Sequence, residues 1–97
     1  MGRPIKIRII RKEPPIKQFS PRGKSGRPGY TELKLEDFEA IRLSDHLGLD
    51  QREAAKFMGI SQQTYSRVLK EARKCVAGAL INGNIIKVKG GEYEFDK

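Results

Sequence analysis

The chain has 97 residues, which is enough for one domain with a single core and too few for two. Hydrophobic residues make up 37% and charged residues 33%, so the core must be modest, and the formal net charge is +8. The positive electrostatic field of such a chain favours a polyanion as its partner. No run approaches the ~20 apolar residues that span a bilayer, and no apolar segment follows the basic N-terminus as a signal peptide requires. We therefore expect a cytoplasmic protein with no membrane partner.

The positive charge is concentrated in two zones. Residues 1–34 carry ten Lys or Arg against two Glu, whereas residues 35–60 have a net charge of −3. Residues 61–83 return to +3, and residues 84–97 are neutral. A polyanion would therefore be met by the N-terminal segment and by residues 61–83.

The N-terminal segment begins with an alternating pattern. Ile5, Ile7 and Ile9 are separated by basic residues, and this period of two predicts a half-buried strand. Residues 14–30 then turn to Pro, Gly, Ser and basic residues, which predicts a loop or extended arm.

A helix is predicted over residues 35–47. Acidic residues crowd its first turn, where the helix dipole favours negative charge, and Gly48 is typical of a helix end. The start follows either Thr31 or Lys34. The apolar residues that share one face are Leu35, Phe38, Ile41 and Leu47, with Ala40 and Leu43 flanking them.

Two further helices are predicted on either side of a short break. Asp50 and Glu53 form a capping pair before a short helix that ends at Gly59. Ser61 is a second N-cap, and the long helix after it ends at residues 82–83. Its apolar positions follow a helical register: Tyr65, Val68, Leu69, Ala72, Cys75, Val76, Ala79 and Leu80.

The C-terminal tail returns to a period of two. Ile86 and Val88 share one face, Gly90 and Gly91 offer a tight turn, and Tyr93 and Phe95 follow, which predicts a hairpin. The N-terminal strand is the obvious third member of its sheet, paired within one chain or between two.

These elements predict one mainly α domain, a helix-turn-helix bundle of three helices with a small β element. The β element combines the N-terminal strand and the C-terminal hairpin. The expected regions are a basic strand and arm (1–34), the helical core (35–83) and the hairpin (84–97).

The helix, glycine turn and longer helix with a polar opening have the organisation of a DNA-binding helix-turn-helix. Once the apolar register is removed, one face of the last helix carries Gln63, Arg67, Lys70 and Lys74. Glutamine can bond two atoms of adenine and arginine two atoms of guanine, while lysine suits phosphates. The helix N-terminus at Ser61 suits a phosphate oxygen. The predicted DNA-binding residues are Ser61, Gln62, Gln63, Thr64, Ser66, Arg67, Lys70, Arg73 and Lys74. The alternative is that they form only the solvated face of an amphipathic helix.

The segment LEDFEAIRLSDHLGLDQREAAKFMGISQQTYSRVLKEARKCVAGALINGNII resembles uncharacterised protein family 0251, also called domain of unknown function 134. The likeness extends to Arg3-Pro4, Pro14-Pro15 and FSPRG at residues 19–23. The core is also similar to the region-4 helix-turn-helix of sigma-70-type factors. The resemblance implies a winged-helix-like DNA-binding regulator whose recognition helix uses Gln62, Gln63, Thr64, Ser66, Arg67 and Lys70. Many members of the family carry cysteine in the N-terminal strand, where this chain has Ile7 or Ile9, which argues against a metal or redox role here.

Two Gly-Arg-Pro tripeptides, centred on Arg3 and Arg27, resemble the core of the AT-hook, which lies in an A·T-rich minor groove. Basic arms of helix-turn-helix proteins enter minor grooves in this way. The alternative is a basic loop that keeps the chain soluble.

Other site chemistry is not expected. Cys75 lies in the apolar register and is expected to be a small buried hydrophobe. His46 has no second ligand at metal spacing, and no glycine-rich phosphate loop follows a strand. The sequence predicts no enzyme, no metal and no cofactor.

The leading hypothesis is a sequence-specific DNA-binding transcriptional regulator that reads a major groove with the helix at 61–76. A homodimer would raise its specificity, through the terminal strands or the helix near residues 75–80. The alternatives are an adaptor that docks on the transcription machinery through the acidic helix at 36–45, or an RNA-binding module.

Overall fold

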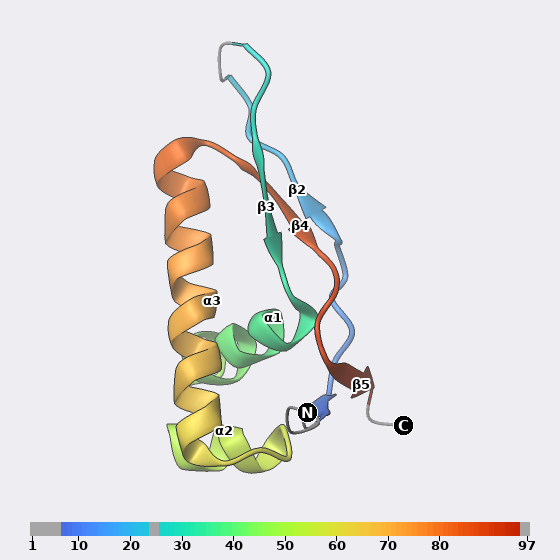
Figure 1. Cartoon of the computed structure of the whole chain (residues 1–97), viewed down its shortest axis with the longest axis vertical. Coiled ribbons are helices and arrows are strands. Elements are labelled where there is room, and N and C mark those ends of the chain that lie inside the picture. Colours follow the sequence, from blue (N-terminus) through green and yellow to red (C-terminus); the bar gives the residue numbers. More distant parts are fainter. Residues whose placement is uncertain (1–6, 24–25, 96–97) are drawn as a thin grey trace, which may run out of the picture.

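The computed structural model describes residues 7–23 and 26–95. Within them, a long helix stands beside a narrow sheet, and two shorter helical segments lie at the foot of that helix (Figure 1). The elements are β1 (Arg8–Ile10), β2 (Gln18–Phe19), β3 (Tyr30–Leu33), α1 (Leu35–Ile41), η1 (Arg42–His46), α2 (Gln51–Phe57), α3 (Gln62–Asn82), β4 (Ile85–Val88) and β5 (Tyr93–Phe95). The prediction of a mainly α fold with small β elements is confirmed.

The first helix begins after Lys34, the later of the two predicted starts. Glu36 and Asp37 occupy its first turn, as the dipole favours. The helix continues without a break into the π-helical turn η1, in which the Leu47 N–H donates to the Arg42 carbonyl. The wider turn rotates the residues that follow it. Leu43 is therefore buried, whereas Leu47, predicted to lie on the buried face, is 52% exposed.

The predicted caps of the next two helices are confirmed. The Asp50 carboxylate accepts the Glu53 N–H at 2.9 Å, and the Ser61 hydroxyl accepts the Thr64 N–H at 3.1 Å. Between the helices, Gly59 has φ +67°, a left-handed conformation that L side chains rarely adopt. This conformation lets α3 leave in a new direction immediately after α2, so that α2 lies across the foot of α3 (Figure 1). Gly83, also left-handed, ends α3.

The strands do not pair as predicted. The prediction of a C-terminal hairpin is wrong, because β4 and β5 belong to different sheets. Strand β4 lies between β2, to which it is antiparallel, and β3, to which it is parallel. Strand β5 pairs in parallel with β1. Gly90 and Gly91 therefore lead the chain from one sheet to the other instead of reversing it.

The N-terminal segment also differs from the prediction. The arm predicted over residues 14–30 contains the short strand β2 and ends at β3, which was not predicted. The described part of the N-terminal strand buries Ile10 completely and leaves Ile7 44% exposed, while Ile5 lies outside the described residues. Strands β1 and β5 pair with each other within the single chain.

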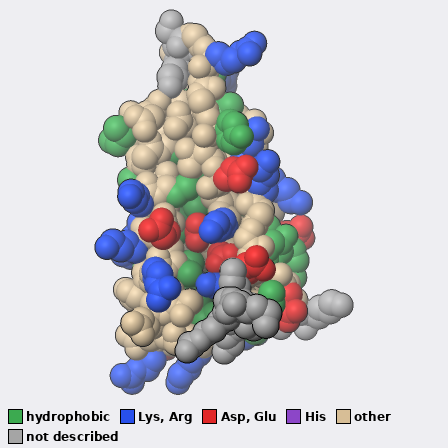
Figure 2. Space-filling model, viewed as in Figure 1, with side chains coloured by type: hydrophobic (Ala, Val, Ile, Leu, Met, Phe, Trp, Pro, Cys, Tyr) green, Lys and Arg blue, Asp and Glu red, His purple; other side chains and the backbone are tan. Residues whose placement is uncertain are grey.

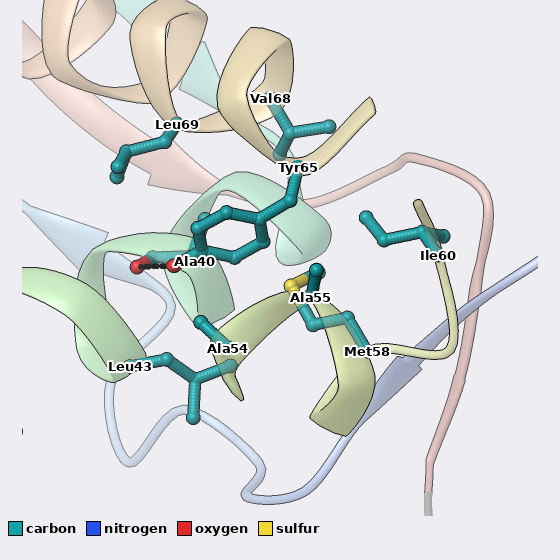
Figure 3. Close-up of a cluster of buried hydrophobic side chains, with 9 residues drawn as sticks. All are labelled: Ala40, Leu43, Ala54, Ala55, Met58, Ile60, Tyr65, Val68 and Leu69. Atoms are coloured by element: carbon teal, nitrogen blue, oxygen red, sulfur yellow. Dashed lines mark hydrogen bonds between the residues drawn. The ribbon is translucent and has the colours of Figure 1, made fainter. Parts of the chain in front are cut away.

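Two clusters of buried side chains form the core. The first joins α1, η1, α2 and the N-terminal half of α3 around the Tyr65 ring, which is fully buried (Figure 3). The Tyr65 hydroxyl donates to the Ala40 carbonyl at 2.8 Å and also contacts the Ser44 hydroxyl. The second cluster packs the middle of α3 against both sheets: Ile10, Leu33, Leu35, Ala72 and Val88.

Buried carboxylates of the first helix fasten the terminal strands. Glu39 is fully buried and accepts hydrogen bonds from the Arg11 N–H and the Arg42 guanidinium. Glu36 pairs with Arg8 at 3.0 Å and accepts the Glu92 N–H at 2.7 Å. The same helix therefore holds β1 and the start of β5 in place, and the acidic zone of the sequence serves the interior of the protein.

Candidate nucleic-acid interface

The candidate interface is built on α3, whose apolar side is fixed by the core. Tyr65, Val68, Leu69 and Ala72 are all buried against the other helices and the sheets. Burial of these residues fixes the rotation of the helix about its own axis. The opposite side of α3 therefore points away from the protein along its whole N-terminal half.

The residues predicted to form a stripe do lie together on that outer side. Gln63, Arg67, Lys70 and Lys74 are exposed and recur at helical spacing. Their side chains make no hydrogen bond or ion pair with any residue in the described part of the chain. Gln62 and Ser66 are exposed beside the stripe. We call the set Gln63, Arg67, Lys70 and Lys74 the outer stripe.

Ser61 and Thr64 differ from the outer stripe because their polar atoms take part in the helix cap. The Ser61 hydroxyl accepts the Thr64 N–H and donates to the Thr64 hydroxyl oxygen at 2.9 Å. Thr64 is half-buried. The cap holds the first turn of α3 rigid beneath Gln62 and Gln63.

Arg73 is not free, although it was predicted among the DNA-binding residues. Its guanidinium makes two hydrogen bonds to the Asp45 carboxylate, at 2.7 and 3.1 Å. The paired guanidinium lowers the pKa of Asp45, and the carboxylate raises the pKa of Arg73. The pair joins α3 to η1, so Arg73 has a structural partner already.

A depression of about 290 Å³ separates the outer stripe from the first helix. Arg67 borders it together with Lys34, Glu36, Asp37 and Glu71. Burial and the neighbouring Glu36 raise the pKa of Asp37 to about 6, and Glu71 adds a smaller contribution. Carboxylates therefore border one side of the stripe, and they would repel a polyanion that approached from that side.

Figure 2 shows Lys and Arg side chains along the edge formed by α3, with further ones at the foot of the molecule. On α2, the exposed basic residues are Arg52 and Lys56. We did not predict these two as site residues, because they lie in a segment whose net charge is negative. Their helical spacing of i, i+4 in front of the glycine turn is the signal that could have revealed them.

Comparison with known proteins places the whole chain in one family. The family model described as "Protein of unknown function DUF134" matches residues 1–96. The chain belongs to this family. Among curated relatives, a UPF0251 protein of Caldicellulosiruptor bescii is 47% identical over 98% of this chain. A UPF0251 protein of Methanothermobacter thermautotrophicus is 44% identical over all of it, and one of Methanococcus maripaludis is 46% identical over 96% of it. No solved structure matches.

The relatives in the DUF134 family are longer than this chain. The aligned region covers 66% of the Caldicellulosiruptor protein, 51% of the Methanothermobacter protein and 72% of the Methanococcus protein. The fold described above therefore corresponds to between half and three quarters of these proteins.

In this DUF134 chain the predicted minor-groove residues lie apart from the outer stripe. Arg27 is exposed in the connection between β2 and β3. This connection projects beyond the C-terminal end of α3 (Figure 1). Arg3 lies outside the described residues. This connection and the first turn of α3, which contains Gln63, lie at opposite ends of the fold, whose longest dimension is 42 Å (Figure 1).

Two searches of the described residues complete the account of this DUF134 site. None of the described helices has the length and apolar character that crossing a membrane would need. No group of three His, Cys, Asp or Glu side chains comes together there as metal ligands would. Cys75 is half-buried, and its thiol donates to the Glu32 carbonyl at 3.3 Å. Burial raises the pKa of this thiol, with a further contribution from Asp37.

Proposed function

We propose that this chain is a sequence-specific DNA-binding protein, a transcriptional regulator that inserts the N-terminal half of α3 into a major groove and catalyses no reaction. The observation that carries the proposal is the outer stripe. Its four polar side chains are exposed and unpaired within the described chain, while the opposite side of the same helix is buried. A major groove about 12 Å wide admits an α-helix in this orientation.

The order of residues along the stripe suits the order of contacts in a groove. Gln63, on the first turn, and Arg67, one turn later, have the donors and acceptors that read adenine and guanine edges. Lys70 and Lys74 lie farther along, where the helix leaves the groove and phosphates are close. Arg52 and Lys56 of α2 are exposed and would contact the phosphate backbone, as the first helix of such a pair does.

The connection that carries Arg27 supports a second, separate contact. Because it lies at the opposite end of the fold from Gln63, it would reach a neighbouring part of the duplex and not the same groove. We propose that Arg27, together with Arg3, adds minor-groove or phosphate affinity there.

The geometry favours DNA over an adaptor that docks through the acidic helix. Glu36, Asp37 and Glu39 are buried, and Asp45 is paired with Arg73. These carboxylates hold the fold together and leave little acidic surface for the transcription machinery to recognise.

The test begins with selection of bound sequences from a random duplex library, followed by titration of variants. Arg67→Ala should cost about 1–3 kcal/mol on the preferred site and relax the base preference at one position. Lys74→Ala should weaken binding to all duplexes alike and reduce the slope of log affinity against log salt by about 1. Fluorescence anisotropy at several salt concentrations measures both effects.

The matched control is Lys17→Ala, which removes the same charge from an exposed position outside α3. It should leave the base preference unchanged. Binding of the Arg67 and Lys74 variants at parental strength would refute the groove assignment. Stronger binding to RNA or to single strands than to duplex DNA at the same salt would support the RNA-binding alternative.

A further inference from the structure

The C-terminal half of α3 carries exposed apolar side chains that the core does not use. Leu80 was predicted to be part of the buried register, but it is 74% exposed, and Ile81 is 85% exposed. Phe19 of β2, 47% exposed, borders the same cavity as Leu80. We call Phe19, Ala77, Leu80 and Ile81 the end patch.

A cavity of about 220 Å³ opens beside these side chains. Its lining is mostly apolar and includes Phe19, Pro21, Ala79 and Ile86. This volume is below the roughly 300–1,000 Å³ of ordinary small-molecule pockets, but it can accept an aliphatic side chain. A protruding side chain and a hole therefore lie next to each other on one surface.

The end patch lies in a neutral part of a highly charged chain. Residues 75–86 contain no charged side chain, although one third of the whole chain is charged and the net charge is +8. Two copies that met elsewhere on their basic surfaces would bring like charges together. A neutral apolar patch does not attract a polyanion, so this end of α3 is unsuited to the partner proposed for its N-terminal half.

We propose that the end patch is the interface with a second copy of this chain, formed by antiparallel contact between the two α3 helices. A two-fold interface needs a surface that fits itself, and the adjacent knob and hole meet this requirement. The backbone can also approach closely on this side, because Ala77, which lies about 60° around the helix from Leu80, is small and exposed. Leu80 of each copy would fill the cavity of the other.

In this dimer both outer stripes remain accessible to DNA. At 100° per residue, Leu80 lies about 100° around the helix from Gln63, so helices that touch along the Leu80 side can present both stripes to the same side. Arg67 precedes Leu80 by about 20 Å at 1.5 Å per residue. Two antiparallel helices that cross near Leu80 would hold their Arg67 residues roughly 40 Å apart. This distance is close to one turn of DNA, the usual spacing of half-sites at about 34–36 Å.

Leu80→Glu tests the dimer in the full chain. It places an unpaired charge in the contact while altering a residue that is already exposed, so the fold should survive, and circular dichroism checks this. We expect the parent to change from monomer to dimer as its concentration rises in sedimentation equilibrium, and Leu80→Glu to remain a monomer. Leu47→Glu, the same change at an exposed leucine outside the patch, should dimerise like the parent. A parent that stays monomeric, or a Leu80→Glu variant that dimerises like the parent, overturns the proposal.

A charge exchange tests which residues meet. A mixture of folded Leu80→Glu and Leu80→Lys chains should form a mixed dimer that neither variant forms alone, because the two changed side chains would lie near each other across the two-fold axis. If the mixture stays monomeric while each variant is folded, the placement of Leu80 at the centre of the contact is wrong.

The spacing of half-sites, unlike the dimer, rests on the proposed function, and DNA binding separates the two. Leu80→Glu should lose about 10²-fold in apparent affinity for a paired site but bind a single half-site as the parent does. A parent that dimerises and binds no DNA would refute the proposed function and leave the dimer standing. A parent that binds DNA tightly as a monomer would refute the dimer and leave the proposed function standing.

Discussion

Individual carboxylates of the acidic segment, residues 35–60, stabilise the interior of the protein. Glu36 and Glu39 have specific partners, namely Arg8, Arg42 and the N–H groups of Arg11 and Glu92. Burying a carboxylate costs free energy unless hydrogen bonds and a counter-charge offset it. Asp37 is the third buried carboxylate, and burial together with the neighbouring Glu36 raises its pKa.

The raised pKa of Asp37 makes stability depend on pH. Its folded pKa of about 6 exceeds the ordinary value of 3.8, so the folded state binds more protons than the unfolded state between these values. The free energy of unfolding therefore falls as the pH rises through this window. Asp37→Asn keeps a side-chain oxygen for the Lys34 N–H and removes the charge, and it should stabilise the protein by about 1 kcal/mol near pH 7.5.

Urea unfolding at pH 7.5 and below pH 3 measures the effect. The gain should vanish at the lower pH, where Asp37 is protonated in both states. Glu71→Gln, at an exposed neighbour, is the control for a general change in charge and should show a smaller gain. An equal gain at both pH values would show that Asp37 acts through packing and not through its charge.

At the scale of elements, the connection between α2 and α3 depends on one backbone conformation. Gly59 has φ +67°, and a side-chain carbon added there would lie 3.1 Å from the Ile9 Cδ1 atom. The left-handed conformation costs about 1–2 kcal/mol for other residues. The turn therefore also lies against β1, so an added side chain would meet strain from its own backbone and from Ile9.

Gly59→Ala should lower the free energy of unfolding by about 2 kcal/mol. For a domain of this size, such a loss lowers the melting temperature by roughly 8–16 °C. Calorimetry provides the measurement, and Gly78→Ala is the control, because that glycine has no positive φ and open space around it. It should be neutral or stabilising, since alanine favours the helix. Equal melting temperatures for the parent and Gly59→Ala would show that the turn tolerates a side chain.

At the scale of the whole molecule, the strands and helices share one interior. Ile10 of β1, Leu33 of β3 and Val88 of β4 pack with Leu35 and Ala72 in a single cluster. Among the described residues, neither sheet therefore has a core that is independent of the helices. Chain ends far apart in the sequence are part of the same core.

Unfolding should therefore be a single cooperative transition. Far-ultraviolet circular dichroism reports the helices, whereas near-ultraviolet signals of Tyr65 and Tyr93 report the first core cluster and the terminal strands. The two urea curves should coincide. An earlier transition in the near-ultraviolet signal, retained in Tyr65→Phe and lost in Tyr93→Phe, would show that the β1–β5 pair unfolds separately.

Local sequence patterns were sufficient to predict the three helices, the N-caps of the second and third, and the outer stripe. These features depend on local chemistry: Asp50 and Ser61 bond to backbone three residues away, and burial of Tyr65, Val68 and Leu69 fixes which side of α3 faces outward. Helical periodicity repeats within a few residues, so a short stretch contains all the information needed to predict it.

The strand partners, the π-helical turn and the pairing of individual charges could not be predicted, because they depend on contacts made in the folded chain. Strand β4 pairs with residues more than fifty positions earlier, and Arg73 bonds to Asp45 across two helices. An alternating pattern shows which residues form a strand but does not specify its neighbour, and a charge shows no partner until the chain has folded. The exposure of Leu80 follows the same rule, because an apolar residue in register is buried only where another element covers it, and α1 and α2 lie beside the N-terminal half of α3 only (Figure 1).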